Sequence, residues 1–84
     1  MHMLKVGISY YIPASEVKFI GDYTSRQMIQ LVKSAKQQGL TIDATRNKAI
    51  LSIIMLKTDN QIILSPVALT TLLKNMRAQQ DNTE

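Results

Sequence analysis

The chain has 84 residues, with ten Lys or Arg against six Asp or Glu, so its net charge is +4 at neutral pH and its length corresponds to one domain. It has no cysteine, which excludes disulfides, thiolate zinc sites and cysteine nucleophiles and fits a reducing compartment. No apolar run approaches the roughly 18 residues that span a bilayer, and no signal-peptide core is present, so we expect a soluble, cytoplasmic protein without membrane contact.

The charge is unevenly distributed along the chain. Residues 79–84 are all polar and include two acids, so we expect a disordered tail after a folded domain of residues 3–78. Without the tail, ten basic residues stand against four acidic ones, a net charge of +6. A small domain this basic suits a polyanion such as DNA or RNA, although basic surfaces also serve solubility alone.

The N-terminal third reads as two strands. Residues 4–12 alternate with period two, which predicts one half-buried strand with Leu4, Val6, Ile8, Tyr10 and Ile12 on its inner face. Pro13 ends it because proline donates no ladder hydrogen bond. Residues 17–20 resume as a second strand, and we expect the two strands to form a hairpin or a bent pair.

A helix is predicted from Ser25 to about Gln38. Thr24 and Gln27 have the spacing of a capping box, and Gly39 is placed to end the helix in the left-handed conformation. The helix has an apolar stripe that should face the core, made of Met28, Leu31, Val32 and Ala35.

Residues 39–65 organise the rest of the chain. A strand over residues 40–45 leads through the basic turn 46–48 into an apolar run, 49–56, and a polar loop, 57–60, joins this run to a second one, 62–64. The pattern predicts an antiparallel hairpin around a type I turn. Apolar runs that do not alternate are typical of strands covered on both faces. Two small helices cannot cover both faces of a five-stranded sheet, so we expect a homo-oligomer with the surplus isoleucines between subunits, namely Ile50, Ile53, Ile54, Ile62 and Ile63.

A second helix follows, with Ser65 as its cap and Pro66 at its first position, where a missing N–H costs nothing. Its predicted inner face consists of Leu69, Leu72, Leu73 and Met76. The resulting order is ββαβββα, an α+β domain with a mainly antiparallel sheet and two helices.

Short motifs run in order from the first helix to the start of the second: Met28-Ile29-Gln30, Ala35, Gly39, Ile42-Asp43-Ala44-Thr45, Ile53-Ile54-Met55 and Ile63-Leu64-Ser65. As a set, over roughly Arg26 to Leu73, they resemble the RemA family of bacterial extracellular-matrix regulators. The resemblance implies a fold similar to LytTR DNA-binding domains, closed homo-oligomeric rings, and binding to double-stranded DNA that activates matrix genes.

The resemblance also assigns candidate DNA contacts. The family carries Tyr-Gly and a pair of arginines after Ile-Asp-Ala-Thr, whereas this chain has Arg46-Asn47-Lys48, which reduces the cluster to one arginine and one lysine. The family's arginine early in its second strand falls on Glu16, with Lys18 two residues away. The candidates for DNA binding are therefore Arg46, Lys48 and Lys18, and the alternative for the basic turn is a solvated connection between strands. Arg26 is a fourth candidate, because its charge could extend the same basic face, and the alternative for it is the solvated side of an amphipathic helix.

Enzymatic chemistry has little support. His2 is the only histidine, the three glycines are scattered, and no metal-ligand spacing occurs, so we expect no catalytic site, cofactor, metal or small-molecule substrate. Asp43 is expected to cap a turn. An exposed Tyr11 could stack on a base or meet another subunit. Together with the basic charge, the resemblance implies a ring-forming DNA-binding regulator, with a ring-forming scaffold that does not bind DNA as the alternative.

Overall fold

The computed structural model describes residues 2–81, and it has the α+β class predicted from the sequence. Two α-helices and six strands are present in this part of the chain, together with one short 3-10 helix. They are β1 (Met3–Gly7), β2 (Tyr10–Pro13), the 3-10 helix η1 (Ala14–Glu16), β3 (Val17–Asp22), α1 (Arg26–Gln37), β4 (Thr41–Asp43), β5 (Ser52–Leu56), β6 (Ile62–Ser65) and α2 (Leu69–Asp81).

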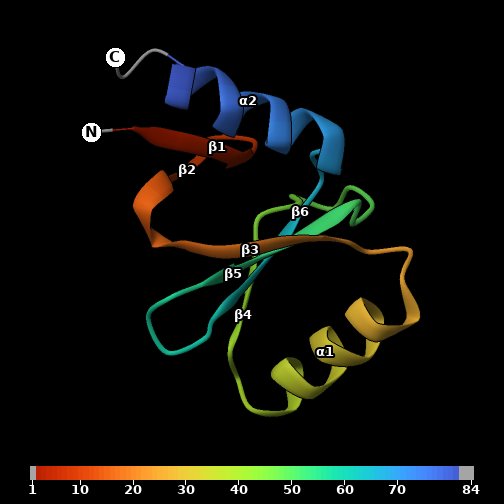
Figure 1. Cartoon of the computed structure of the whole chain (residues 1–84). Helices are drawn as coiled ribbons and strands as arrows, with labels where there is room; N and C mark the ends of the chain where they lie inside the picture. The colour runs from red at the N-terminus through yellow and green to blue at the C-terminus, as the bar shows by residue number, and fades with distance from the viewer. Residues whose placement is uncertain (1, 82–84) are drawn as a thin grey trace.

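The strands form two sheets rather than one. β3, β5, β6 and β4 lie side by side in that order, with β4 parallel to β6 and the other pairs antiparallel, while β1 and β2 form a separate hairpin. The predicted β5–β6 hairpin is confirmed, whereas the parallel pairing of β4 was not expected. Figure 1 shows α1 on one side of the four-stranded sheet and the hairpin with α2 on the other.

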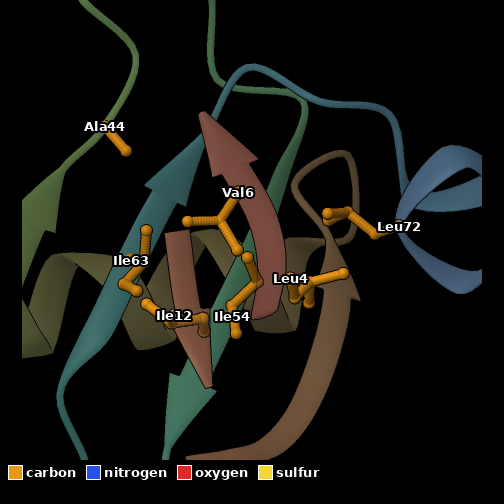
Figure 2. Packing of buried hydrophobic residues seen from close by; sticks show 7 residues of the cluster. All are labelled: Leu4, Val6, Ile12, Ala44, Ile54, Ile63 and Leu72. Carbon is orange, nitrogen blue, oxygen red and sulfur yellow. The ribbon is translucent and has the colours of Figure 1, made fainter. Parts of the chain in front are cut away.

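The central strands β5 and β6 are buried on both faces, as their unbroken apolar sequence predicted. On one face, Ile53, Met55, Ile62 and Leu64 pack against α1, whose predicted stripe is confirmed by the burial of Val32 and Ala35. On the other face, Ile54 and Ile63 pack against the hairpin and α2. Figure 2 shows this second cluster, which consists of Leu4, Val6, Ile12, Ala44, Ile54, Ile63 and Leu72.

The expectation that isoleucines left uncovered by one chain would lie between subunits was wrong, because these side chains are buried within a single chain. Ile53, Ile54, Ile62 and Ile63 are each at most 1% exposed within a single chain. Helix α1 covers Ile53 and Ile62. Ile54 and Ile63 are covered because the N-terminal residues fold back over the sheet as a hairpin instead of extending it, so the core sheet has four strands and not five. Burial of these isoleucines therefore requires no second subunit.

The N-terminal strand prediction fails at Ile8 and Ser9. These two residues form the turn of the β1–β2 hairpin, with Ser9 at a φ of 65°, and both Ile8 and Tyr10 are exposed instead of facing the core. β3 pairs with β5 and not with the preceding strand. The alternating pattern correctly marks Leu4, Val6 and Ile12 as buried, but it carries no signal for the reversal between them.

The two ends of α1 differ in how well they were predicted. At the C-terminal end, Gly39 has a φ of 71°, which confirms the predicted left-handed end of the helix. Its N–H donates to Lys36 O and the Leu40 N–H donates to Ala35 O, so the helix ends in a Schellman motif. At the N-terminal end, Ser25 is the cap residue and makes no side-chain capping bond. The capping box at Thr24 was therefore wrong.

The start of α2 was also misplaced. Ser65 is the last residue of β6 and is fully buried; its Oγ donates to Val6 O at 2.6 Å and accepts from the Val67 N–H at 3.0 Å. The helix begins only at Leu69, so Ser65 joins the sheet to the hairpin instead of capping a helix. Leu72 is buried as predicted, but Leu73 is 48% exposed.

Turns and element lengths show smaller differences. The β5–β6 turn places Asp59 and Asn60 at positive φ, 58° and 53°, which is the signature of a type I′ turn and not of the expected type I. Both β4 and β5 are shorter than predicted, because residues 44–51 form an irregular connection. The helix α2 continues to Asp81, and residues 82–84 of the expected tail lie outside the described residues.

Candidate nucleic-acid interface

The basic segment after β4 forms a tight turn of defined conformation. The Lys48 N–H donates to Thr45 O at 3.1 Å, and the two central residues, Arg46 and Asn47, have φ values of 51° and 72°. Two successive positive φ values again indicate a type I′ turn. Asn tolerates this left-handed conformation, whereas Arg does so only at a cost in backbone energy.

The base of this turn is held by Asp43. Its Oδ1 accepts from the Thr45 N–H at 2.9 Å and from Thr45 Oγ1 at 2.6 Å. These bonds lower the pKa of Asp43, first through the Thr45 side chain and then through its backbone, and the nearby charge of Lys36 acts in the same direction. The prediction that Asp43 caps a turn is confirmed. Thr45 itself is buried, so the first residue of the turn is held in place by its surroundings.

A close backbone contact between β1 and Ala44 holds the residue that precedes Thr45. A Cβ atom added to Gly7 of β1 would lie 2.5 Å from Ala44 O and 2.9 Å from Ala44 Cβ. The end of β1 can therefore approach Ala44 this closely only because residue 7 has no side chain. Ala44 also donates its N–H to Leu64 O of β6 at 3.0 Å. The turn is thus attached to both the hairpin and the sheet.

The side chains of the turn itself point to solvent. Arg46, Asn47 and Lys48 are all exposed, and none of their side chains makes a hydrogen bond or an ion pair within residues 2–81. Two cations are therefore presented on a rigid base without an internal partner. This arrangement can neutralise phosphates without first breaking bonds inside the protein.

Lys18 is not part of this cationic site. It lies at the start of β3, where Val17 pairs with Leu56, whereas Lys48 precedes the opposite end of the sheet, where Asp22 pairs with Ser52. The Lys18 Nζ donates to Asn60 Oδ1 in the β5–β6 turn at 3.2 Å. The structure therefore separates Lys18 from Arg46 and Lys48 by the length of the strands.

Arg26 lies at the same end of the sheet as the basic turn. It is the first residue of α1, and the chain reaches it from β3 through a turn in which the Ser25 N–H donates to Asp22 O at 3.3 Å. The adjacent Tyr23 N–H donates to Leu51 O, in the segment that follows Lys48. Arg26 is exposed, so three of the four candidate residues remain at one end of the molecule.

Other candidate features are absent or altered in the part of the chain that the structure describes. Tyr10 and Tyr11 are both exposed, at 38% and 54%, although one of the pair was expected to face the core. No group of three or more His, Asp or Glu among the described residues could hold a metal ion. Neither helix, as far as it is described, is long and apolar enough to cross a membrane.

The comparison with protein families agrees with this architecture. A family model described as RemA-like, extracellular matrix regulatory protein A-like, matches residues 3–76. The chain belongs to this family. The match starts in β1 and ends in α2, so it includes the hairpin as well as the basic turn and is wider than the motifs between Arg26 and Leu73. A comparison with individual curated proteins finds no match.

Two properties of this RemA-like site could not be found from the sequence. The left-handed backbone at Arg46 could not be predicted from the residue type, because arginine rarely adopts this conformation. The contact between Gly7 and Ala44 joins residues 37 positions apart, and only the packed structure brings them together. A glycine within an alternating strand was the one available hint of a close backbone approach.

Proposed function

We propose that this RemA-like protein is a cytoplasmic, homo-oligomeric transcription regulator of extracellular-matrix genes that binds double-stranded DNA through the turn Thr45–Lys48. The observation that carries the proposal is the exposed pair Arg46 and Lys48 on a turn whose base is fixed by Asp43, Thr45 and Gly7. Contacts of this kind neutralise phosphates, position the protein and are largely independent of sequence.

Repetition of the turn around a ring supplies the affinity that one copy lacks. A single turn offers two cations, with Arg26 as a third at the same end, and linked copies bind the same DNA at a high effective concentration. The exposed apolar residues of the β1–β2 hairpin offer a surface for contact between subunits; they are Met3, Ile8, Tyr10 and Tyr11. Static light scattering should give the mass of an oligomer, and a monomer at micromolar concentration would contradict the ring.

A gel-shift titration of a DNA duplex across salt concentrations tests the DNA contact. Each phosphate that is neutralised adds about −0.9 to the slope of log affinity against log salt, so a ring should show a steep slope. Arg46→Ala and Lys48→Ala should each weaken binding and flatten the slope, because each removes a contact from every engaged subunit. Lys74→Ala is the matched control, since it removes an exposed cation from α2, away from the turn.

The alternative is a ring-forming scaffold or protein-interaction module that does not bind DNA. One observation favours it: Lys18 is bonded to Asn60 at the far end of the sheet, so the cationic surface is smaller than the four candidate residues would give. An intact oligomer without measurable affinity for duplex DNA at about 50 mM salt would select this alternative, because salt of that order leaves phosphate contacts strong.

A further inference from the structure

A groove of about 370 Å3 lies between strand β3 and helix α2. Leu73, Met76 and Arg77 line it on the helix side, and residues 17–20 line it on the strand side. Leu73 is 48% exposed, although its helical spacing placed it on the predicted inner face of α2. The groove is therefore an apolar surface that the chain itself leaves uncovered.

The groove reaches the open edge of the four-stranded sheet. β3 is an edge strand, with β5 on one side and no strand on the other among the described residues. Successive side chains of a strand point to opposite faces, yet four consecutive residues, 17–20, line the groove. The groove therefore follows the edge of β3 and not only one of its faces.

Main-chain groups are available along this edge. The Tyr23 N–H donates to Leu51 O, so Tyr23 and Leu51, just beyond the Asp22–Ser52 pair, form a hydrogen-bonded pair. In two antiparallel strands such hydrogen-bonded pairs recur at every second residue, and the residues between them direct their main-chain groups to the other side. The N–H and C=O groups of Ile20 and the N–H of Asp22 consequently point away from β5, toward the open edge, while Asp22 O already accepts from the Ser25 N–H. Such groups can pair with an additional strand.

The charges around the groove have one sign. Lys18 and Arg77 line it, and Lys74 lines the adjoining depression on α2 together with Arg77. No acidic side chain of the described residues lines either depression. Two acids lie at the ends of β3 but do not line the groove: Glu16 precedes the strand and its Oε1 accepts from Thr58, and Asp22 ends the strand and its Oδ1 accepts from the Thr24 N–H.

We infer that this groove binds an extended, acidic segment of a partner protein by strand addition. The segment pairs its backbone with the open edge of β3, and its alternate apolar side chains enter the space between β3 and α2 beside Leu73 and Met76. Its carboxylates lie near Arg77 and Lys74. Main-chain bonds give affinity in this mode of recognition, while the pocket and the charges select the sequence. The inference is independent of DNA binding, because it uses neither Arg46 nor Lys48.

The test uses the full-length protein and two fluorescein-labelled peptides of eight residues, one alternating Asp and Val and the other Lys and Val. Fluorescence anisotropy should show binding of the acidic peptide only. The double variant Lys74→Glu, Arg77→Glu should weaken that binding at least about tenfold and should gain affinity for the basic peptide, because attraction across the rim is reversed. A variant that merely unfolds could not gain affinity in this way.

The matched control is the double variant Lys33→Glu, Lys57→Glu, which makes the same charge change at two exposed positions outside the groove and should leave the affinity for the acidic peptide within about twofold. Hydrogen exchange should slow at the amides of Ile20 and Asp22 when the acidic peptide binds.

Three results would overturn the inference. One is equal binding of the two peptides, or binding that the Lys74→Glu, Arg77→Glu variant retains. A second is a loss of oligomer mass in Leu73→Asp without any binding of the acidic peptide, which would assign the groove to another copy of the chain. A third is binding to vesicles of anionic phospholipid without binding of the peptide, which would assign it to a membrane surface.

Discussion

The molecule contains two turns of the same backbone type, one at each end of the sheet, and their side chains are bonded differently. Each has two adjacent non-glycine residues at positive φ, Asp59 and Asn60 in the β5–β6 turn and Arg46 and Asn47 in the basic turn. The β5–β6 turn is tied to the start of β3 by side chains, because Thr58 Oγ1 donates to Glu16 Oε1 at 2.8 Å and Lys18 Nζ donates to Asn60 Oδ1. The basic turn is fixed only at its base.

The difference shows that one backbone conformation can either hold its side chains against the rest of the chain or leave them exposed. In the β5–β6 turn, the neutral side chains of Thr58 and Asn60 are bonded to charged residues at the start of β3. In the basic turn, the polar residues below the tip, Asp43 and Thr45, form the bonds, and the side chains at the tip stay free for another molecule. A rigid base with unpaired cations is what a phosphate-binding surface requires.

The largest expected effect concerns the base of the basic turn. Gly7→Ala should lower the free energy of unfolding by about 3 kcal/mol, because the added Cβ meets the backbone and side chain of Ala44, which cannot move without breaking the contact with β6. Chemical denaturation measures the change. Gly21→Ala is the control, since its added Cβ meets the flexible Met28 Sδ at 2.5 Å and should cost less. Equal losses would show that the approach of Gly7 to Ala44 has no special role.

A second, smaller effect concerns the hydrogen bonds of Ser65, which join β6 of the sheet to β1 of the hairpin. Ser65→Ala should lower the free energy of unfolding by about 2 kcal/mol, because it leaves the buried Val6 O and the Val67 N–H without their partner. Thr58→Ala removes an exposed bond to Glu16 at the other turn and should cost less than about 0.5 kcal/mol. Thermal unfolding of both variants would test whether the two ends of the sheet differ in this way.

Glycine substitutions separate the backbone of the two turns from their side chains. Arg46→Gly and Asp59→Gly should each raise the free energy of unfolding by about 0.5–1 kcal/mol, because glycine adopts positive φ without a Cβ clash. Only Arg46→Gly should also weaken DNA binding and flatten its salt dependence. An Arg46→Gly variant with unchanged DNA affinity would assign the basic turn to structure alone.

The smallest effect is the pH dependence of the base of the basic turn. The pKa of Asp43 lies below its ordinary value of 3.8 in the folded protein, so its bonds to Thr45 stabilise the fold fully above that value and stop doing so as the pH falls through the lowered pKa. Asp43→Asn should therefore lower the melting temperature slightly at neutral pH, and the difference from the natural protein should shrink in acid. Full stability combined with lost DNA binding would mean that Asp43 has a direct functional role.

The sequence predicted the candidate site in part. Arg46, Lys48 and Arg26 do lie at one end of the sheet, because the loop after β4 and the start of α1 meet there. Lys18 was grouped with them from a resemblance, but position along a strand determines which end of a sheet a residue occupies, and β3 places Lys18 at the other end. The groove beside Leu73 was missed because helical spacing assigned that residue to the core.

Features that depend on residues close together in the chain could be predicted from the amino-acid sequence. The stripe of α1, its termination at Gly39, the β5–β6 hairpin and the turn-capping role of Asp43 all follow from local spacing and local hydrogen bonds. The pairing of distant segments could not be predicted in this way. The reversal at Ile8 and Ser9, the parallel β4–β6 pair and the burial of Ser65 against Val6 depend on packing across the sheet. An alternating pattern indicates which side chains of a strand are buried, but it does not indicate which segment of the chain packs against them.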